Sequence, residues 1–155
     1  MEQKFLKVKA WICAFFTGVG TILGWKGALL VSWVTVMALD YGSGTAAACK
    51  EGKWSSKVAR QGLWHKAGMM LAVLVAGIAD ASLSVIARYI PIGIQWPGLL
   101  LPLVLAWYII TELGSILENS VKLGAAVPVW LIRMLEASAD VIDKAGELPG
   151  EKQDR

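Results

Sequence analysis

Residues 67–90 have the sequence AGMMLAVLVAGIADASLSVIARYI, in which Asp80 and Arg88 are the only charged side chains. A helix of 24 residues is about 36 Å long at 1.5 Å per residue, which exceeds the hydrocarbon thickness of a bilayer, roughly 30 Å. Neither the length nor the apolar character fits a strand or a surface loop. We therefore expect residues 67–90 to form a membrane-spanning helix.

Three more apolar runs accompany this stretch, at residues 10–25, 27–49 and 98–119. Over the 155 residues, 56% are hydrophobic and 17% are charged, with a mean hydropathy of +0.57, which lies well off the soluble average. The sequence predicts an all-α fold, an integral membrane helical bundle with three to four transmembrane helices. The run 10–25 is short for a bilayer, so its spanning stays open.

The segment 128–145 predicts a C-terminal amphipathic helix. Proline suits the first position of a helix, and Pro128 begins this segment. Apolar residues recur at helical spacing, while Arg133, Glu136 and Asp140 take the other face. Such a helix lies on a membrane or packs on a partner. The polar tail 146–155 is expected to be disordered.

Basic residues predict the organisation and orientation of the chain. We expect an N-terminal basic segment with a short apolar helix (1–26), a transmembrane core (27–119) with a basic loop at 50–66, and a cytoplasmic C-terminal part (120–155). If four runs span, 13 of the 15 Lys and Arg lie on one side, which the positive-inside rule makes the cytoplasm. With three spans the number is 10. Both arrangements put the basic loop and the C-terminus in the cytoplasm.

Small residues and one carboxylate recur at every fourth position of the run 67–90: Gly68, Ala72, Ala76, Asp80 and Ser84. Small side chains let helices approach closely, and a carboxylate can hydrogen-bond across the contact. Such a stripe suits association between copies as well as packing within one chain, and both interpretations stay open.

Two further runs carry carboxylates at depth. The run 27–49 contains Asp40, Tyr41 and Gly44, and the last run contains a set of polar residues: Glu112, Ser115, Glu118, Asn119 and Lys122. Ionisable groups at such depth face a bundle interior or a watery cavity. We interpret these residues as helix-association or lumen residues. Neutral hydrogen-bonded packing and a proton relay or ion-coupled transport are the alternatives.

Nothing in the sequence indicates catalysis, a cofactor or a metal site. Cys13 and Cys49 lack Cys or His neighbours at metal-ligand spacing, and His65 is the only histidine. No nucleophile and base pairing or Gly-rich phosphate loop stands out. No basic run interleaved with aromatics predicts nucleic-acid binding. We therefore expect no enzyme, no cofactor and no nucleic-acid partner.

Three motifs resemble the toxin-secretion and phage-lysis holin family: Leu39-Asp40-Tyr41 with Gly44; Ser55-Ser56-Lys57-Val58 with Gly62-Leu63 and Lys66; and Ser115-Ile116-Leu117-Glu118-Asn119 with Leu123-Gly124 and Pro128. The similarity covers residues 24–135, and the last motif is its most specific part. Ser43 stands where the family usually has Thr, and Thr111 stands where Asn is expected.

The resemblance implies a non-enzymatic protein of the bacterial cytoplasmic membrane, usually with three spans, that oligomerises into holes. Such holes release an endolysin or let large proteins leave the cell. The implied partners are the lipid bilayer, other copies of the chain and, functionally, an endolysin. A small ion channel or ion-coupled transporter subunit is the alternative, and a membrane scaffold is a third hypothesis.

Overall fold

The computed structural model describes residues 2–90 and 95–146, and within these ranges all regular structure is α-helical. The helices are α1 (Glu2–Lys50), α2 (Ser56–Tyr89), α3 (Leu100–Lys122) and α4 (Val129–Gly146). The all-α prediction is therefore confirmed. Most of the tail that was expected to be disordered, residues 147–155, lies outside the described residues.

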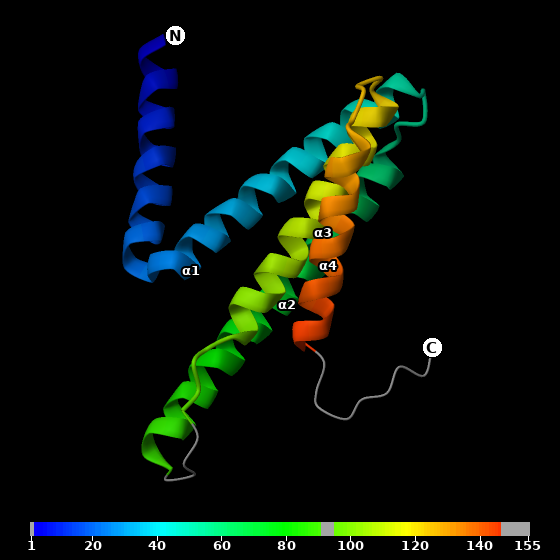
Figure 1. The fold of residues 1–155 in the computed structure, drawn as a ribbon. Helices are drawn as coiled ribbons and strands as arrows, with labels where there is room; N and C mark the ends of the chain where they lie inside the picture. The colour runs from blue at the N-terminus through cyan, green and yellow to red at the C-terminus, as the bar shows by residue number, and fades with distance from the viewer. Residues whose placement is uncertain (1, 91–94, 147–155) are drawn as a thin grey trace.

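Helix α1 consists of two segments that meet at Gly24. This residue has φ 59° and ψ −140°, a backbone conformation that glycine adopts far more easily than any residue with a Cβ. Figure 1 shows the segment before Gly24, in dark blue, standing apart from the other helices. The segment after Gly24 packs into the bundle, so the kink separates an N-terminal arm from the core.

The core forms between the second segment of α1, α2 and α3, with α3 in the middle. Helix α3 contacts each of the other three helices, while α1 and α2 touch each other at few places. Trp33 and Met37 of α1, Met69 and Val73 of α2 and the fully buried Leu105 of α3 make up the hydrophobic centre. Buried positions three and four residues apart give each helix one inward face.

Side chains of the neighbouring helices cap both ends of α3. At the N-terminus, Asp80 of α2 accepts hydrogen bonds from the backbone N–H groups of Leu100 (3.1 Å) and Leu101 (2.9 Å). At the C-terminus, Lys50 Nζ of α1 donates to the carbonyls of Lys122 (3.3 Å) and Leu123 (2.7 Å). These groups lack partners within their own helix, and each charge also suits the helix dipole.

The connection before α3 is held to both other core helices. Trp96 Nε1 donates to Asp80 Oδ1 (2.9 Å), and Lys26 Nζ of α1 donates to the Gly98 carbonyl (2.8 Å). Gly98 has φ +71°, and a Cβ at this position would lie 2.6 Å from Lys26 Nζ. The positive φ favours a glycine here, and a Cβ would also push Lys26 Nζ away from the Gly98 carbonyl.

The outer surfaces of α2 and α3 fit a membrane. Both helices are long and apolar enough to cross one, and only 22% of the apolar window of α2 and 17% of that of α3 is buried. Helix α2 alone exposes a broad set of large apolar side chains: Leu63, Leu71, Leu74, Val75, Ile78 and Val85. Monomeric soluble proteins rarely expose contiguous apolar patches of this extent. The fold is that of a helical membrane protein.

The sequence analysis predicted a basic loop at 50–66, and this predicted length is wrong. Helix α2 begins at Ser56, and the Ser55 hydroxyl caps it by accepting a hydrogen bond from Val58 N (3.2 Å). Lys57 and Arg60 lie exposed on the first turns of this helix, whereas Lys66 is buried. The many basic residues in this segment indicated a solvated loop. The capped first turns of α2 have the same basic composition, so composition alone could not distinguish the two.

The amphipathic helix expected at 128–145 is α4, and Pro128 directly precedes its first residue. Figure 1 shows α4, in orange, folded back alongside α3. Leu131, Leu135, Ala139 and Ile142 form the half-buried face of α4, and Trp107 Nε1 of α3 donates to Asp143 Oδ1 (2.8 Å). The partner on which this helix packs is therefore α3 of the same chain.

Replacing Asp80 should reveal its role as the cap of α3. In Asp80→Leu the amides of Leu100 and Leu101 lose their acceptors, so we expect the free energy of unfolding to fall by about 2 kcal/mol. Asp80→Asn keeps one acceptor oxygen and should lose about half as much. Unfolding in detergent micelles by SDS, followed by circular dichroism, measures both values. The exposed Ser82→Ala is the control, and equal stability of Asp80→Leu and this control would contradict the cap.

Candidate functional site

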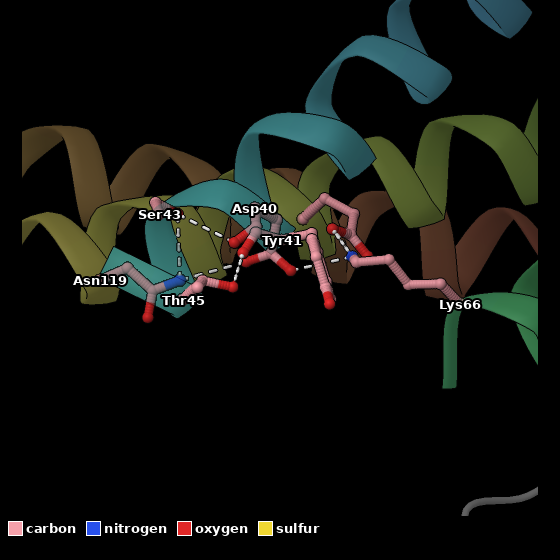
Figure 2. A network of polar contacts seen from close by, with 7 residues as sticks. Asp40, Tyr41, Ser43, Thr45, Lys66 and Asn119 are labelled. Carbon is pink, nitrogen blue, oxygen red and sulfur yellow. Dashed lines mark hydrogen bonds and ion pairs between the residues drawn. The ribbon is translucent and has the colours of Figure 1, made fainter. Parts of the chain in front are cut away.

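Each core helix contributes one charged side chain to the same level of the bundle. Lys66 Nζ of α2 lies 2.9 Å from Asp40 Oδ2 of α1 and 2.5 Å from Glu112 Oε2 of α3. Lys66 and Glu112 are buried and Asp40 is half-buried, with side-chain exposed fractions of 9% for Lys66, 5% for Glu112 and 16% for Asp40. Figure 2 shows Lys66 extending from α2 toward Asp40 on α1. We refer to these residues as the charged triad.

The charged triad lies at an equal depth in all three helices. Asp40 is ten residues before Lys50, Lys66 is ten residues after Ser56, and Glu112 is ten residues before Lys122. At 1.5 Å per residue, each group is about 15 Å from the same end of the bundle. The register of the helices therefore brings the charges together.

Asn119 extends the triad by two further turns of α3. Its side chain is buried, and Nδ2 donates to Asp40 Oδ1 (3.2 Å) and to Ser43 Oγ (3.2 Å). A Cβ at Gly44 would lie 3.4 Å from Asn119 Nδ2, so the glycine leaves room for the amide. Asp40 thus accepts from Asn119 through one oxygen and from Lys66 through the other (Figure 2).

A small cavity of about 230 Å³ borders the triad. Tyr41, His65 and Ser115 line it together with Gly44 and Asn119. Tyr41 and His65 are exposed at its edge, whereas Ser115 is half-buried between the cavity and the groove under α4. The cavity gives Asp40 and Lys66 a partly polar surface on one side.

The structure brings together six of the residues that the sequence analysis predicted to serve helix association or a lumen. Asp40, Glu112 and Asn119 are in direct contact with the triad or belong to it, and another three surround them: Tyr41, Gly44 and Ser115. Glu118 instead lies exposed on the side of α3 that faces α4. Whether these residues serve association or a lumen stays a prediction.

The stripe of small residues on α2, from Gly68 to Ser84, is partly buried in the bundle and partly exposed. Ala76 and Asp80 are buried, Ala72 and Ser84 are half-buried, and Gly68 is exposed. The stripe turns because four residues exceed one turn of 3.6, so each step moves about 40° around the helix. Asp80 lies 14 residues beyond Lys66, where its carboxylate caps α3 and its backbone carbonyl accepts from Ser84 Oγ (2.7 Å).

Lys66 is the functional residue that the sequence analysis missed. It was assigned to a solvated loop because five basic residues lie between residues 50 and 66. A signal was nevertheless present, since carboxylates within apolar runs need a counter-charge and Lys66 directly precedes the apolar stretch. The sequence alone does not say which carboxylates meet it.

Charged side chains outside the bundle contribute little to the stability of the fold. Lys53 Nζ lies 2.9 Å from Glu51 Oε2 in the loop between α1 and α2. This hydrogen bond lowers the pKa of Glu51, and the carboxylate raises the pKa of Lys53. Both side chains are in solvent, where such pairs stabilise a fold weakly. The triad differs because its charges are removed from water.

The triad is suited to holding helices together. In the ranges that the structure describes, no group of three His, Cys, Asp or Glu side chains could hold a metal ion. Two carboxylates and one ammonium in a place of low dielectric attract strongly, and removing one partner leaves an uncompensated charge. The site therefore ties α1, α2 and α3 to one another.

The sequence model of the bacteriophage holin family matches residues 17–140, a range that includes the whole triad. The chain belongs to this family. It is also similar to an uncharacterized protein, BH0965, of Halalkalibacterium halodurans, with 30% identity over 122 residues that cover 78% of this chain and 86% of the relative. No solved structure matches the chain. Holins are a non-enzymatic, pore-forming class of membrane proteins.

Lys66→Met should destabilise this holin-family chain strongly. The substitution leaves Asp40 and Glu112 buried without their cation, so we expect the free energy of unfolding to fall by about 3 kcal/mol. SDS unfolding in micelles measures the change, and Lys57→Met on the exposed side of α2 is the matched control. A triple variant with Asp40→Leu and Glu112→Leu should recover most of the loss. A Lys66→Met protein as stable as the control would show that the triad contributes nothing.

Proposed function

We propose that this chain is a holin that accumulates in the bacterial cytoplasmic membrane, oligomerises there and opens lesions. Through these lesions an endolysin or another large protein leaves the cytoplasm. The observation that carries the proposal is a bundle with an apolar outer surface and a charged interior, in a member of the bacteriophage holin family. Apolar surface keeps monomers in lipid, and the polar interior supplies groups for a water-filled lesion.

Three spans fit this bundle. Helices α2 and α3 meet the criteria of length and hydropathy, and the segment of α1 after Gly24 packs along α3. Asp40 in that segment costs about 2.5 to 3.5 kcal/mol on insertion, a cost that its ion pair with Lys66 offsets. The arm before Gly24 is the additional segment of the four-span arrangement.

The end of the bundle nearest the triad is the cytoplasmic end in this proposal. Lys53, Lys57, Arg60 and Lys122 are exposed there, while Arg88 lies near the opposite end of α2. Positive charge near span ends favours the cytoplasm. Exposed aromatic side chains occur toward both ends, with Trp64 on one side and Tyr89 on the other, as in the aromatic belts of membrane proteins.

Lesion formation exchanges contacts within a monomer for contacts between copies. In the monomer, Lys66 and Asn119 satisfy Asp40, and Lys66 satisfies Glu112. Helix contacts through small residues such as the exposed Gly68 require crowding, because lipid competes for the same surface. Once copies assemble, water in a growing lumen hydrates the carboxylates. The monomer therefore stays inactive until its density in the membrane rises.

A small ion channel is the second candidate. The cavity of about 230 Å³ lined by the carboxylate of Asp40 favours it, because acidic groups along a watery path attract cations. This alternative differs from a holin in the size of what passes. Ions alone cross a channel, whereas a folded enzyme crosses a lesion.

Inducible expression in bacteria separates the two. We expect the membrane potential to collapse after a delay and a cytoplasmic reporter such as β-galactosidase to appear in the medium when an endolysin is co-expressed. Any ion leak collapses the potential, but only a large hole lets the folded endolysin reach the cell wall and release the reporter. A potential-sensitive dye and the enzyme activity of the medium follow the two events. Collapse of the potential while an unaided endolysin stays inside the cell would support the channel instead.

The triad supplies matched controls for this experiment. Lys57→Met should lyse cells at the same time as the unaltered chain, since Lys57 is exposed. Lys66→Met should show altered timing at equal membrane content, since it weakens the contacts that hold the monomer. Identical lysis times for both variants would show that the triad does not control the timing of lysis.

A further inference from the structure

The C-terminal end of α4 lies deep along α3. The two helices are antiparallel, because residues 123–128 connect them and Trp107 Nε1, near the start of α3, donates to Asp143 Oδ1, near the end of α4. Trp107 is 15 residues before Lys122, which corresponds to about 23 Å along the helix. Since α3 is long and apolar enough to cross a membrane of roughly 30 Å, the end of α4 lies within the thickness of that membrane.

The outer side of α4 carries charges over this whole depth. Arg133, Asp140 and Lys144 are exposed and follow at offsets of 0, 7 and 11, which places them on one face. We refer to these three residues as the charged face of α4. The segment that follows, 147–155, is also rich in charge, with Glu147, Glu151, Lys152, Asp154 and Arg155. Ionisable groups are strongly disfavoured in hydrocarbon, so the charged face requires water at a depth where lipid offers none.

The rest of the surface of α4 is apolar on two further sides. One side, which includes Leu135 and Ala139, is half-buried and lines the groove on α3. The other side is a stripe of Trp130, Met134 and Val141, which are 63%, 60% and 67% exposed. Successive residues are about 100° apart around a helix, so this stripe points away from both α3 and the charged face. Helix α4 therefore has one side for protein, one for lipid and one for water, as the wall of a lumen requires.

A flat position on the membrane surface is the alternative for α4. It would also place the charges in water and the apolar stripe in lipid, but it would separate α4 from α3. The contact with α3 favours the upright position, because the hydrogen bond between Trp107 and Asp143 fixes the far end of α4. Glu118 of α3 and Glu136 of α4 line the groove between the helices, and both are exposed. These carboxylates also need water beside the upright helix.

We propose that the charged face of α4 lines the water-filled lumen of the lesion while α4 remains against α3. The inference rests on the proposed function and adds a second wetted surface to its lesion. The stripe of Trp130, Met134 and Val141 then faces lipid on the outer side of the lumen wall. The charged face contains both signs, so it hydrates the lumen without a single-sign ring that would select ions.

A covalent link between α3 and α4 tests whether α4 stays in place. In the full chain with Cys13→Ser and Cys49→Ser, a short bismaleimide joins Gly114→Cys to Ala139→Cys in liposomes of phosphatidylethanolamine and phosphatidylglycerol. Both positions line the groove, and a Cβ at Gly114 would meet no atom within 4 Å. We expect the linked protein to release fluorescent dextran as fully as the control, Ala139→Cys alone treated with the same reagent. Loss of dextran release on linking would show that α4 leaves α3 and would overturn the proposal.

Spin labels on neighbouring residues test which side of α4 is wet. Asp140→Cys and Val141→Cys, each in the same Cys13→Ser and Cys49→Ser chain, place a nitroxide at almost equal depth on different faces, and both positions are exposed. We expect a water-soluble nickel chelate to collide about tenfold more often with the label at 140 than with that at 141, because hydrocarbon holds little water. Equal accessibility would place α4 in solution, and equal protection would place the charged face against protein. Either result would overturn the proposal.

A small anionic dye in the same liposomes separates this inference from the proposed function. Dextran that escapes only from the unlinked protein overturns the inference and leaves the holin function intact. Escape of dye without dextran from both proteins, with the contrast between positions 140 and 141, supports a lumen lined by α4 and counts against the holin function alone. A chain that releases neither solute at high density has no lumen, a result that overturns both.

Discussion

The ion pairs of Lys66 with Asp40 and Glu112 set the relative heights of the three core helices. A second polar cluster lies at the other end, where Asp80 caps α3 and Lys26 binds the connection before it. Lys66 and Asp80 are 14 residues apart in α2, and so are Lys26 and Asp40 in α1, which corresponds to about 21 Å in each helix. An apolar layer that includes Leu105 fills the space between the clusters. Shifting one helix would break contacts at both ends together.

This arrangement follows from the lack of water within a bilayer. Backbone groups at helix ends and charged side chains must find their partners in the protein, because lipid offers none. Helix α3 meets the requirement through Asp80 at its N-terminus and Lys50 at its C-terminus, so both neighbours are needed to complete it. The outer surface of the bundle has few polar groups that need a partner, so it can face lipid or other copies. The proposed function, in which subunits accumulate singly before they assemble, needs this difference between the inside and the outside of the bundle.

The helices could be predicted from the sequence because the apolar runs are local and three of them, 27–49, 67–90 and 98–119, have the length of a span. The kink could be placed only approximately, since the sequence shows a change in composition near residue 26 but not the backbone angles of Gly24. The triad could not be predicted, because it depends on the heights of three helices and Lys66 resembled its basic neighbours. The capping role of Asp80 depends in the same way on the path of a connection. Local pattern thus identified the carboxylates but not their partners.

Helix α4 is the element to which these constraints apply least. The charges of the core are compensated within the chain, whereas Arg133 and Asp140 of α4 are exposed and depend on water. The location of water therefore decides where α4 stays: against α3 if its outer side is hydrated, and away from α3 if lipid lies there. Because the groove of about 620 Å³ between α3 and α4 is loosely packed, movement of α4 away from α3 loses few contacts. The stability of the core and the mobility of this helix then have a common origin, the contrast between charges paired inside the protein and charges that only solvent can satisfy.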